Sequence, residues 1–325
     1  MRLKSIIKKI ALYKDIVAEP PILIDIGASG KLNAMWSKIA SFSICIAFDA
    51  DQREFDYIEQ KETKFLKQFV FNKIVVASSD KPKQPFYLTH SPYCSSLLKP
   101  NINSLKEFQI SDKFEVKEIV EIDVIELKIV LAQLNINRID WFKTDSQGTD
   151  LSLFKSLTEE IQNNIIVLEL EPGFMNAYLG EDKIVDVMNE MENRPFILSN
   201  FTTKGSLRIP KIDFDRIVKS DLTKKIISHT YKKTPGWAEM IYLNNMLKTG
   251  FKSREFLLAW LFATLQNHHD LAFVFADNAS VKFNDEIFNN LKQYSEKKLR
   301  TDIYTFKSVF KMFNIFFQKY ITKTY

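Results

Sequence analysis

The sequence predicts an α/β fold: a mostly parallel sheet with a terminal antiparallel strand pair, followed by a C-terminal helical extension. Three observations support this prediction. Short runs of β-branched and apolar residues alternate with stretches of helical spacing over residues 20–248. These strand-like runs are apolar almost throughout, which is typical of parallel strands buried on both faces. Beyond residue 250 the pattern becomes helical.

The first half of the sheet follows an alternating order of strands and helices. The expected strands are 22–26, 43–49 and 69–79, and the expected helices between them are about 33–40 and 52–62. This βαβαβ order indicates parallel strands with helices on both faces. A less regular insertion of about 81–114 follows the third strand.

The second half continues the pattern and ends differently. The expected strands are 116–122, 138–145 and 164–171, and the expected helices are about 124–134, 150–157 and 182–192. Two later runs, 195–201 and 238–244, are expected to form the antiparallel edge pair. The polar, Lys-rich stretch between them is expected to be a surface excursion.

Three segments are expected along the chain. A basic N-terminal segment spans 1–19, the α/β domain spans 20–248, and a helical extension spans 249–325. Helices are expected in the extension at about 256–265, 287–299 and 303–321, with Asn284 or Asp285 as the N-cap of the second. Its longest apolar run, nine residues from Leu257 to Leu265, is too short to cross a bilayer.

The net charge of +5 is unevenly distributed. The first 14 residues carry five basic residues and no acid, while residues 15–283 carry 32 basic and 36 acidic residues. A nucleic-acid substrate is therefore not expected, because the body of the chain lacks a basic surface. The basic aromatic C-terminal helices suggest either packing on the rest of the molecule or a second subunit, or peripheral membrane contact. For the basic ends, solvated helix faces are the favoured interpretation, and a membrane surface or a polyanionic partner is the alternative.

The cysteines and histidines indicate the cellular compartment and whether a metal site is expected. Cys45 lies in an apolar run, which favours a buried thiol in a reducing compartment, so we expect a cytoplasmic protein, with association to a membrane as the alternative. His268, His269 and Asp270 lack the helical spacing and nearby third ligand of a metal site. No metal is expected.

Acidic and small residues follow the expected strands, where ligands bind in open α/β sheets. The first strand ends with Asp25, Gly27, Ala28 and Gly30, the second with Asp49 and Ala50, the third with Ser79, the fourth with Lys143, Asp145 and Gln147, and the fifth with Glu169 and Glu171. Asp49 lies 22 residues after Gly27, a separation that lets a carboxylate accept the ribose hydroxyls of an adenosine cofactor.

Asp25 decides which cofactor is expected. A dinucleotide pyrophosphate requires the Gly-x-Gly-x-x-Gly turn and gains nothing from a carboxylate beside its phosphates. Here the pattern is Asp-x-Gly-x-x-Gly, which suits a cofactor with cationic groups and no phosphate. The sequence therefore favours S-adenosylmethionine and methyl transfer over a nicotinamide cofactor and hydride transfer.

Five blocks of the sequence resemble FkbM-type methyltransferases in order and spacing. They are DIGASG, IAFDAD, SSLLKP, IDWFKTDSQGTD and VLELEP, and the resemblance covers roughly residues 20–245. It implies a Rossmann-like class I methyltransferase fold that uses S-adenosylmethionine to methylate a small acceptor, often a sugar hydroxyl. The chain departs from the family pattern at Ser29, Lys31 and Gln147.

Roles follow for individual residues. Asp145 is the first candidate for the base that removes the acceptor proton, with Lys143 on the same face of the strand and His90 as the alternative base. The expected cofactor-binding residues are Asp25, Gly27, Ala28, Gly30, Asp49, Ala50, Ser79 and Asp145. The expected acceptor-binding residues are Ser95, Ser96, Gln147 and Glu171, with the insertion around Tyr93 as a lid or acceptor wall.

Three functions remain open at this point. The first is an S-adenosylmethionine-dependent O-methyltransferase acting on a sugar, glycan or similar small polar acceptor. The second is an NAD-dependent oxidoreductase, which the missing glycine of the turn disfavours. The third is a non-catalytic scaffold that retains the fold.

Overall fold

The structure is a computed structural model that describes residues 2–27, 35–48, 64–248, 250–301, 309–310 and 312–313. The chain divides into two compact units: Glu19–Leu247 forms one, and Met1–Ala18 with Lys248–Tyr325 forms the other. The basic N-terminal segment thus shares a unit with the C-terminal helices. The expected helix 52–62 and the expected cofactor residues Ala28, Gly30, Asp49 and Ala50 lie outside the described residues.

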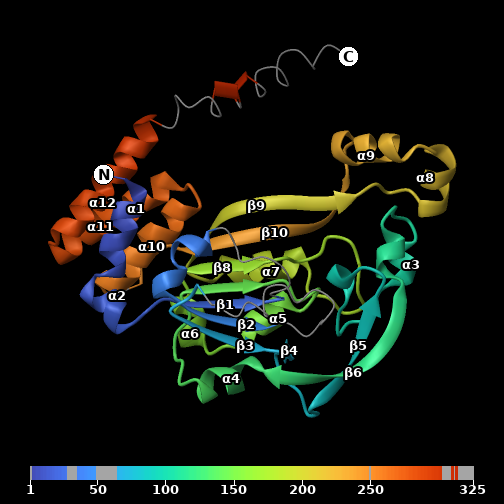
Figure 1. The fold of residues 1–325 in the computed structure, drawn as a ribbon, viewed down its shortest axis with the longest axis horizontal. Helices are drawn as coiled ribbons and strands as arrows, with labels where there is room; N and C mark the ends of the chain where they lie inside the picture. Colours follow the sequence, from blue (N-terminus) through green and yellow to red (C-terminus); the bar gives the residue numbers. More distant parts are fainter. Residues whose placement is uncertain are drawn as a thin grey trace. The chain divides into compact units, whose positions relative to one another are not determined.

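A seven-stranded sheet forms the centre of the larger unit (Figure 1). Its strand order is β3-β2-β1-β7-β8-β10-β9, with bounds β3 Lys67–Phe71, β2 Ile44–Phe48, β1 Ile22–Ile26, β7 Trp141–Thr144, β8 Val167–Leu170, β10 Thr234–Asn244 and β9 Phe196–Ser206. The first five strands pair in parallel, whereas β10 is antiparallel to both β8 and β9. The prediction of a mixed α/β fold with a mostly parallel sheet is confirmed.

Burial explains why these strands read as continuous apolar runs. All five residues of β1 are buried, because β1 lies between β2 and β7. One core cluster joins side chains of β1, β2, β7, β8 and β10 with side chains of the helices of this unit. The helices are α4 Leu127–Gln133, α5 Asp150–Lys155, α6 Glu159–Asn164 and α7 Ile184–Glu192.

The expected strand 69–79 is two strands in two different sheets. β3 ends at Phe71, exposed Asn72 and Lys73 form the break, and β4 (Ile74–Val76) pairs in parallel with β6 (Val116–Glu126). β6 also pairs antiparallel with β5 (Lys83–Thr89), which makes a three-stranded sheet. The prediction of a single strand was wrong because the polar turn at 72–73 separates two apolar runs.

The insertion after β4 is more regular than expected. Besides β5 it contains the short helix α3 (Ile102–Leu105) and two 3₁₀ turns, Pro92–Cys94 and Ser111–Phe114. The region expected to be helical at about 33–40 instead forms two 3₁₀ turns in its described part, Trp36–Lys38 and Ala40–Phe42.

The antiparallel pair is longer than the two apolar runs that predicted it. β9 and β10 each span 11 residues and pair from Thr234–Ser206 to Asn244–Phe196. The excursion between them contains α8 (Lys211–Ile217) and α9 (Asp221–Thr230). Figure 1 shows both helices beyond the ends of these strands.

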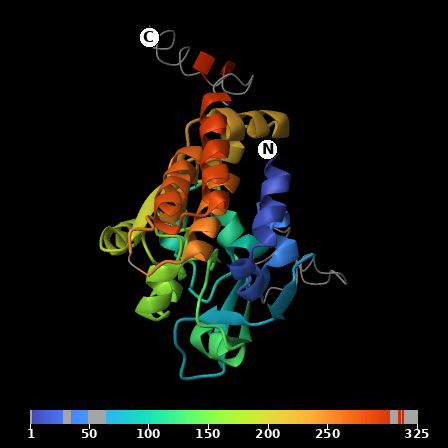
Figure 2. The same cartoon turned by 90° about the vertical axis from the view of Figure 1, so that its left-hand side faces the viewer.

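The smaller unit is helical. It contains α1 Leu3–Ala11, α2 Lys14–Ala18, α10 Ser253–Leu265, α11 His269–Phe283 and α12 Glu286–Thr301. Figure 2 shows the orange and red helices α10–α12 running side by side. The Tyr13 hydroxyl donates to Asp285 over 2.8 Å and the Ser253 hydroxyl donates to Asp15 over 2.6 Å, which ties the N-terminal segment to the C-terminal helices.

The sequence did not predict helix α11, but it did predict the N-cap of α12. Asp285 accepts a hydrogen bond from the backbone N–H of Ile287 over 3.0 Å, while Asn284 ends α11 in the left-handed conformation. His269 lies in the first turn of α11 and is buried. Across the described segments, no set of three or more His, Cys, Asp or Glu side chains is placed to bind a metal ion.

Within the described ranges, no helix combines the length and apolarity that a bilayer span requires. The most apolar of the described helices, α10, is buried along nearly its whole length.

Candidate functional site

The ends of β1 and β7 meet at a glycine. Gly27 follows β1 with a φ of +77°, and a Cβ atom at this position would lie 2.3 Å from the carbonyl oxygen of Asp145. The backbone N–H of Asp145 donates to the carbonyl of Ile26 over 2.9 Å, so the two strand ends are held together. This close approach requires glycine and places Asp145 directly beside the first turn.

Replacing Gly27 by alanine is expected to lower the free energy of unfolding by about 3 kcal/mol, because the residue would be strained at positive φ and would clash with backbone. Gly180 is a matched control: its φ is also +77°, but nothing lies within 4 Å of the position of its Cβ. The Gly180→Ala variant should lose about 1 kcal/mol, from strain alone. Chemical denaturation of both variants measures the difference, and equal losses would contradict the close approach.

A buried ion pair joins β1 and β7 close to these strand ends. Lys143 Nζ lies 2.6 Å from Asp25 Oδ1, and the Asp25 side chain is 8% exposed. Burial is the largest single effect and lowers the pKa of Lys143, but the charge and hydrogen bond of Asp25, together with the charges of Asp145 and Glu169, outweigh it, so the pKa of Lys143 is raised. Asp25 therefore has a cationic partner of its own, which the sequence did not predict.

Three further carboxyl groups gather around Lys143. Burial raises the pKa of Asp145 to about 6 and that of Glu169 to about 7, while Lys143 opposes both shifts. Burial also raises the pKa of Glu171 to about 9, and the neighbouring carboxyls of Asp145 and Asp150 add to this shift. Acids thus outnumber the nearby cation, and the cluster favours either protons or a cationic ligand.

Asp150 holds the loop ends in place. Its carboxylate accepts hydrogen bonds from the backbone N–H of Ser146 over 2.9 Å and from that of Glu171 over 2.6 Å. Asp150 is buried and joins the loop after β7 to the end of β8. This fixes the backbone of Glu171 relative to the loop that follows Asp145.

Gln147 lies next to the carboxylate of Asp145. Its side-chain N–H donates to Asp145 Oδ1, and its backbone has a φ of +57°. The Tyr178 hydroxyl lies 3.0 Å from Gln147 Oε1 and 2.9 Å from the carbonyl oxygen of Cys94. Gln147 thus orients Asp145, and Tyr178 and the insertion support Gln147.

A cavity of about 610 Å³ opens beside these groups. Asp145, Gln147 and Glu171 line it, together with residues of the insertion, of the loop after β8, of the β9–β10 pair and of α8 and α9. Its size is typical of a small-molecule site. Its wall also includes Tyr93, Tyr178, Lys204, Phe214, Lys224, Ser228, Lys233, Trp237 and Glu239.

Three predicted residues of the insertion do not line the cavity. His90 is exposed and does not line the cavity, and its backbone N–H donates to the carbonyl of Glu115 over 2.8 Å. The buried Ser95 accepts a hydrogen bond from the backbone of Thr89, and the buried Ser96 donates to the carbonyl of Gln147 over 2.8 Å. Both serines support loop backbone, because their hydroxyls are used internally and they do not line the cavity.

Ser79 is also placed differently from the prediction. It follows β4 of the small sheet, not a strand of the central sheet. Its hydroxyl donates to the carbonyl of Lys81 over 2.7 Å and accepts from the Gln84 amide over 2.9 Å. A cofactor role for Ser79 stays a prediction.

The raised pKa of Glu171 predicts a stability that depends on pH. The unfolded chain releases this proton near the ordinary value of 4.5, whereas the folded protein holds it to about 9. Between these values the wild type should therefore lose up to about 1.4 kcal/mol of unfolding free energy per pH unit relative to Glu171→Gln. Denaturation at about pH 5 and about pH 8 measures the slope.

Glu190 provides a control of opposite sign. Burial opposes its ionisation, but hydrogen bonds from Arg194 lower its pKa. The contribution of Glu190 to the stability of the fold is present above its ordinary pKa of 4.5 and is lost as the pH falls. Glu190→Gln should therefore destabilise the protein at about pH 7. Identical pH slopes in the wild type and in Glu171→Gln would contradict the buried neutral acid at 171.

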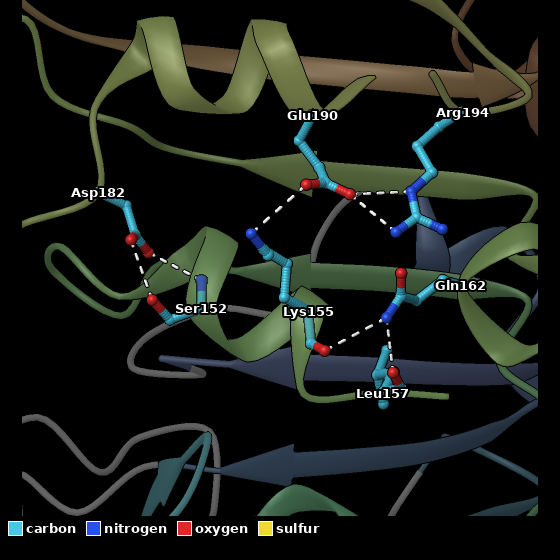
Figure 3. A network of polar contacts seen from close by, with 7 residues as sticks. All are labelled: Ser152, Lys155, Leu157, Gln162, Asp182, Glu190 and Arg194. Atoms are coloured by element: carbon cyan, nitrogen blue, oxygen red, sulfur yellow. Dashed lines mark hydrogen bonds and ion pairs between the residues drawn. The ribbon is translucent and has the colours of Figure 1, made fainter. Parts of the chain in front are cut away.

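A second polar cluster lies on helices α5, α6 and α7 (Figure 3). Glu190 accepts from Arg194 over 2.8 Å and lies 3.5 Å from Lys155, and the Ser152 hydroxyl donates to Asp182 over 3.0 Å. Each of these charged groups has a partner within the cluster. We therefore assign these contacts to the packing of the three helices.

Sequence reasoning missed part of the cavity wall. Tyr178 lies in the irregular loop after β8, where no periodic pattern marks it. Trp237 and Glu239 alternate with buried Ala238 along β10, so the period-two pattern of that strand could have identified them. Lys204 pairs with Glu239 across the β9–β10 pair over 3.1 Å.

Comparison with protein families gives one match. Residues 74–198 match the Methyltransferase FkbM domain, which supports the resemblance seen in the sequence and indicates a methyltransferase domain. The matched range contains β7, β8, Asp145, Gln147 and Glu171 and begins after β1. Comparisons with curated proteins and with solved structures returned no match.

Proposed function

We propose that this chain, with its methyltransferase-type segment 74–198, transfers a methyl group from S-adenosylmethionine to a hydroxyl of a sugar, glycan or similar small polar acceptor. The observation that carries the proposal is that Asp145 and Glu171, which directly follow the neighbouring strands β7 and β8, line one cavity together with Gln147. Burial raises the pKa of Glu171 more than that of Asp145, which is typical of an acid and a base that work together.

The residues at the end of β1 suit this cofactor. Gly27 presents backbone without a side chain, and Asp25, Asp145 and Glu169 make the surroundings acidic. S-adenosylmethionine supplies, when bound, an electrophilic methyl group on a sulfonium. We propose that Asp25 and Gly27 hold it together with Ala28, Gly30, Asp49 and Ala50, which lie outside the described residues.

Asp145 is the proposed base. With a pKa of about 6 its carboxylate is ionised at neutral pH, and Gln147 holds it in position by a hydrogen bond. An acceptor hydroxyl in the cavity would give its proton to this carboxylate as its oxygen forms the new bond to carbon. Lys143 keeps the pKa of Asp145 from rising further and so preserves the ionised form.

Glu171 is the proposed hydrogen-bond donor. With a pKa of about 9 it is protonated at neutral pH and lines the same cavity as Asp145. A neutral carboxylic acid can donate to an acceptor oxygen, which an ionised carboxylate cannot do. Glu171 and Gln147 would thus orient the acceptor, while Asp145 accepts its proton.

A pH profile of methyl transfer tests these roles. Transfer of a labelled methyl group from S-adenosylmethionine to a panel of sugars and glycans is expected to rise through about pH 6 and fall through about pH 9, following Asp145 and Glu171. The Glu171→Gln variant should lose the fall at high pH, because the amide remains a donor. If the rate of methyl transfer by Glu171→Gln still falls through about pH 9, the proposed role of Glu171 is contradicted.

The two alternative functions, an NAD-dependent oxidoreductase and a non-catalytic scaffold, make different predictions. A dinucleotide would bring its pyrophosphate close to the acidic cluster, where it would be repelled. A scaffold would have no use for two cavity acids with separated pKa values. Binding of the cofactor without transfer to any member of a broad acceptor panel would favour the scaffold.

A further inference from the structure

Residues 204–233, the basic hairpin, differ in charge from the rest of the larger unit. They contain nine basic residues and three acidic ones, whereas residues 15–283 as a whole carry more acids than bases. All three acids are used within the hairpin: Asp215 lies 2.6 Å from Lys224 and 3.0 Å from Lys211, Asp213 lies 3.1 Å from Arg216, and Asp221 lies 4.0 Å from Lys224. The surplus positive charge therefore remains at the surface.

Four lysines carry this surplus. The ammonium groups of Lys219, Lys225, Lys232 and Lys233 form no ion pair or hydrogen bond with the part of the chain that the structure describes. The first three are exposed, and Lys233 is exposed at the mouth of the cavity.

The same hairpin exposes large apolar side chains. Ile212 is 80% exposed, Ile217 62%, Leu222 69%, Ile226 52% and Tyr231 63%. No residue of α9 is buried, and α8 buries only Phe214. Helices that bury almost nothing in their own protein gain little from packing, so this apolar surface is available to a partner.

Apolar and basic side chains share one face of α9. Leu222, Lys225, Ile226 and His229 follow one another at positions i, i+3, i+4 and i+7, which lie on the same side of a helix. All four are exposed. Exposed apolar residues interleaved with lysines are typical of helices that lie in a membrane interface.

The hairpin borders the cavity. Phe214, Lys224, Ser228 and Lys233 all line it. The hairpin is joined to the insertion by an ion pair of 2.6 Å between Arg208 and Glu107. Figure 1 shows α8 and α9 beyond the ends of β9 and β10. A surface that docks here would lie at the mouth of the cavity.

We propose that the basic hairpin binds the surface of an anionic lipid bilayer, with its lysines on lipid phosphates and its apolar side chains in the interface. The charge favours this partner over a second copy of the chain, because a symmetric contact would place one basic face against another. The proposal is independent of methyl transfer, since bilayer binding requires neither cofactor nor acceptor.

Co-sedimentation of the full chain with vesicles tests the proposal. The protein should pellet with mixed phosphatidylglycerol and phosphatidylcholine vesicles at low salt, but not with phosphatidylcholine alone. Lys225→Gln with Lys232→Gln should lower the partition coefficient about 25-fold, at about fivefold per lysine. Leu222→Ser with Ile226→Ser should lower it about tenfold.

Matched substitutions elsewhere in the same unit are the controls. Lys73 and Lys117 are exposed lysines without an ion pair among the described residues, and Ile129 is a helical isoleucine that is 42% exposed. Lys73→Gln with Lys117→Gln should lower the partition coefficient at most about twofold. Ile129→Ser should also lower it at most about twofold, because it leaves the apolar side chains of the basic hairpin unchanged.

Three results would overturn the proposal. The first is a wild type that does not pellet with anionic vesicles, as expected if the hairpin binds an acidic protein instead. The second is hairpin variants that pellet like the wild type, which would place the contact in the basic ends of the chain. The third is a dimer in sedimentation equilibrium that the hairpin substitutions dissociate.

Discussion

Replacing Asp145 by asparagine is expected to reduce the turnover of methyl transfer by about 10²- to 10⁴-fold, the usual contribution of a general base. Asparagine keeps the shape of the side chain and can still pair with Gln147, but it cannot take a proton. The rate should also lose its rise through about pH 6, because the group that titrates there is gone. Steady-state transfer to the best acceptor of the panel measures both effects.

Asp182 provides the control for this substitution. Burial raises its pKa as it does that of Asp145, but Asp182 lies in the helix cluster with Ser152 and does not line the cavity (Figure 3). Asp182→Asn should change turnover less than about twofold. A similar rate loss in both variants would mean that Asp145→Asn acts through stability and not through proton transfer.

Replacing Lys143 by methionine is expected to lower the free energy of unfolding by about 3–5 kcal/mol, because it leaves the carboxylate of Asp25 buried without its partner. The pKa values of Asp145 and Glu169 should rise, since Lys143 lowers both. The low-pH limb of the activity profile should therefore move to higher pH. Denaturation and the pH profile measure the two effects separately.

Two further variants separate the effect of breaking the ion pair from the effect of removing a lysine side chain. Lys143→Met combined with Asp25→Asn should recover most of the lost stability, because no buried charge is left unpaired. Lys155→Met removes an exposed partner of Glu190 at 3.5 Å and should cost less than about 1 kcal/mol. A Lys143→Met variant no less stable than Lys155→Met would contradict a buried ion pair at β1 and β7.

The strands and their ends could be predicted because burial leaves a clear pattern. The apolar runs of β1, β2, β7 and β8 end at the residues that the sequence placed at one edge of the sheet. Asp145, Gln147 and Glu171 were predicted site residues, and the structure brings them to one cavity. Their roles stay predictions until activity is measured.

Contacts between distant segments could not be predicted. Ser95 and Ser96 have the composition of binding residues, but their hydroxyls satisfy backbone groups brought near only by folding. The partner of Asp25 is Lys143, 118 residues away, which spacing alone does not reveal. Tyr178 reaches Gln147 from an irregular loop, where residue type gives no sign of position.

The division of the apolar run 69–79 has a similar cause. Two polar residues, Asn72 and Lys73, interrupt it, and the strand pattern continues on both sides. Only pairing decides that β3 joins β2 while β4 joins β6 in another sheet. Ser79 consequently moved from the expected edge of the central sheet to the small sheet.

Calorimetric titration with S-adenosylmethionine in two buffers of different ionisation enthalpy tests the central claim most directly. If the cation binds beside Asp145 and Glu169, it should lower their pKa values, so binding should release protons at about pH 7. Asp49→Ala should abolish the heat, and NADH should give none. Absence of S-adenosylmethionine binding by the wild type, or binding of NADH in its place, would contradict the account.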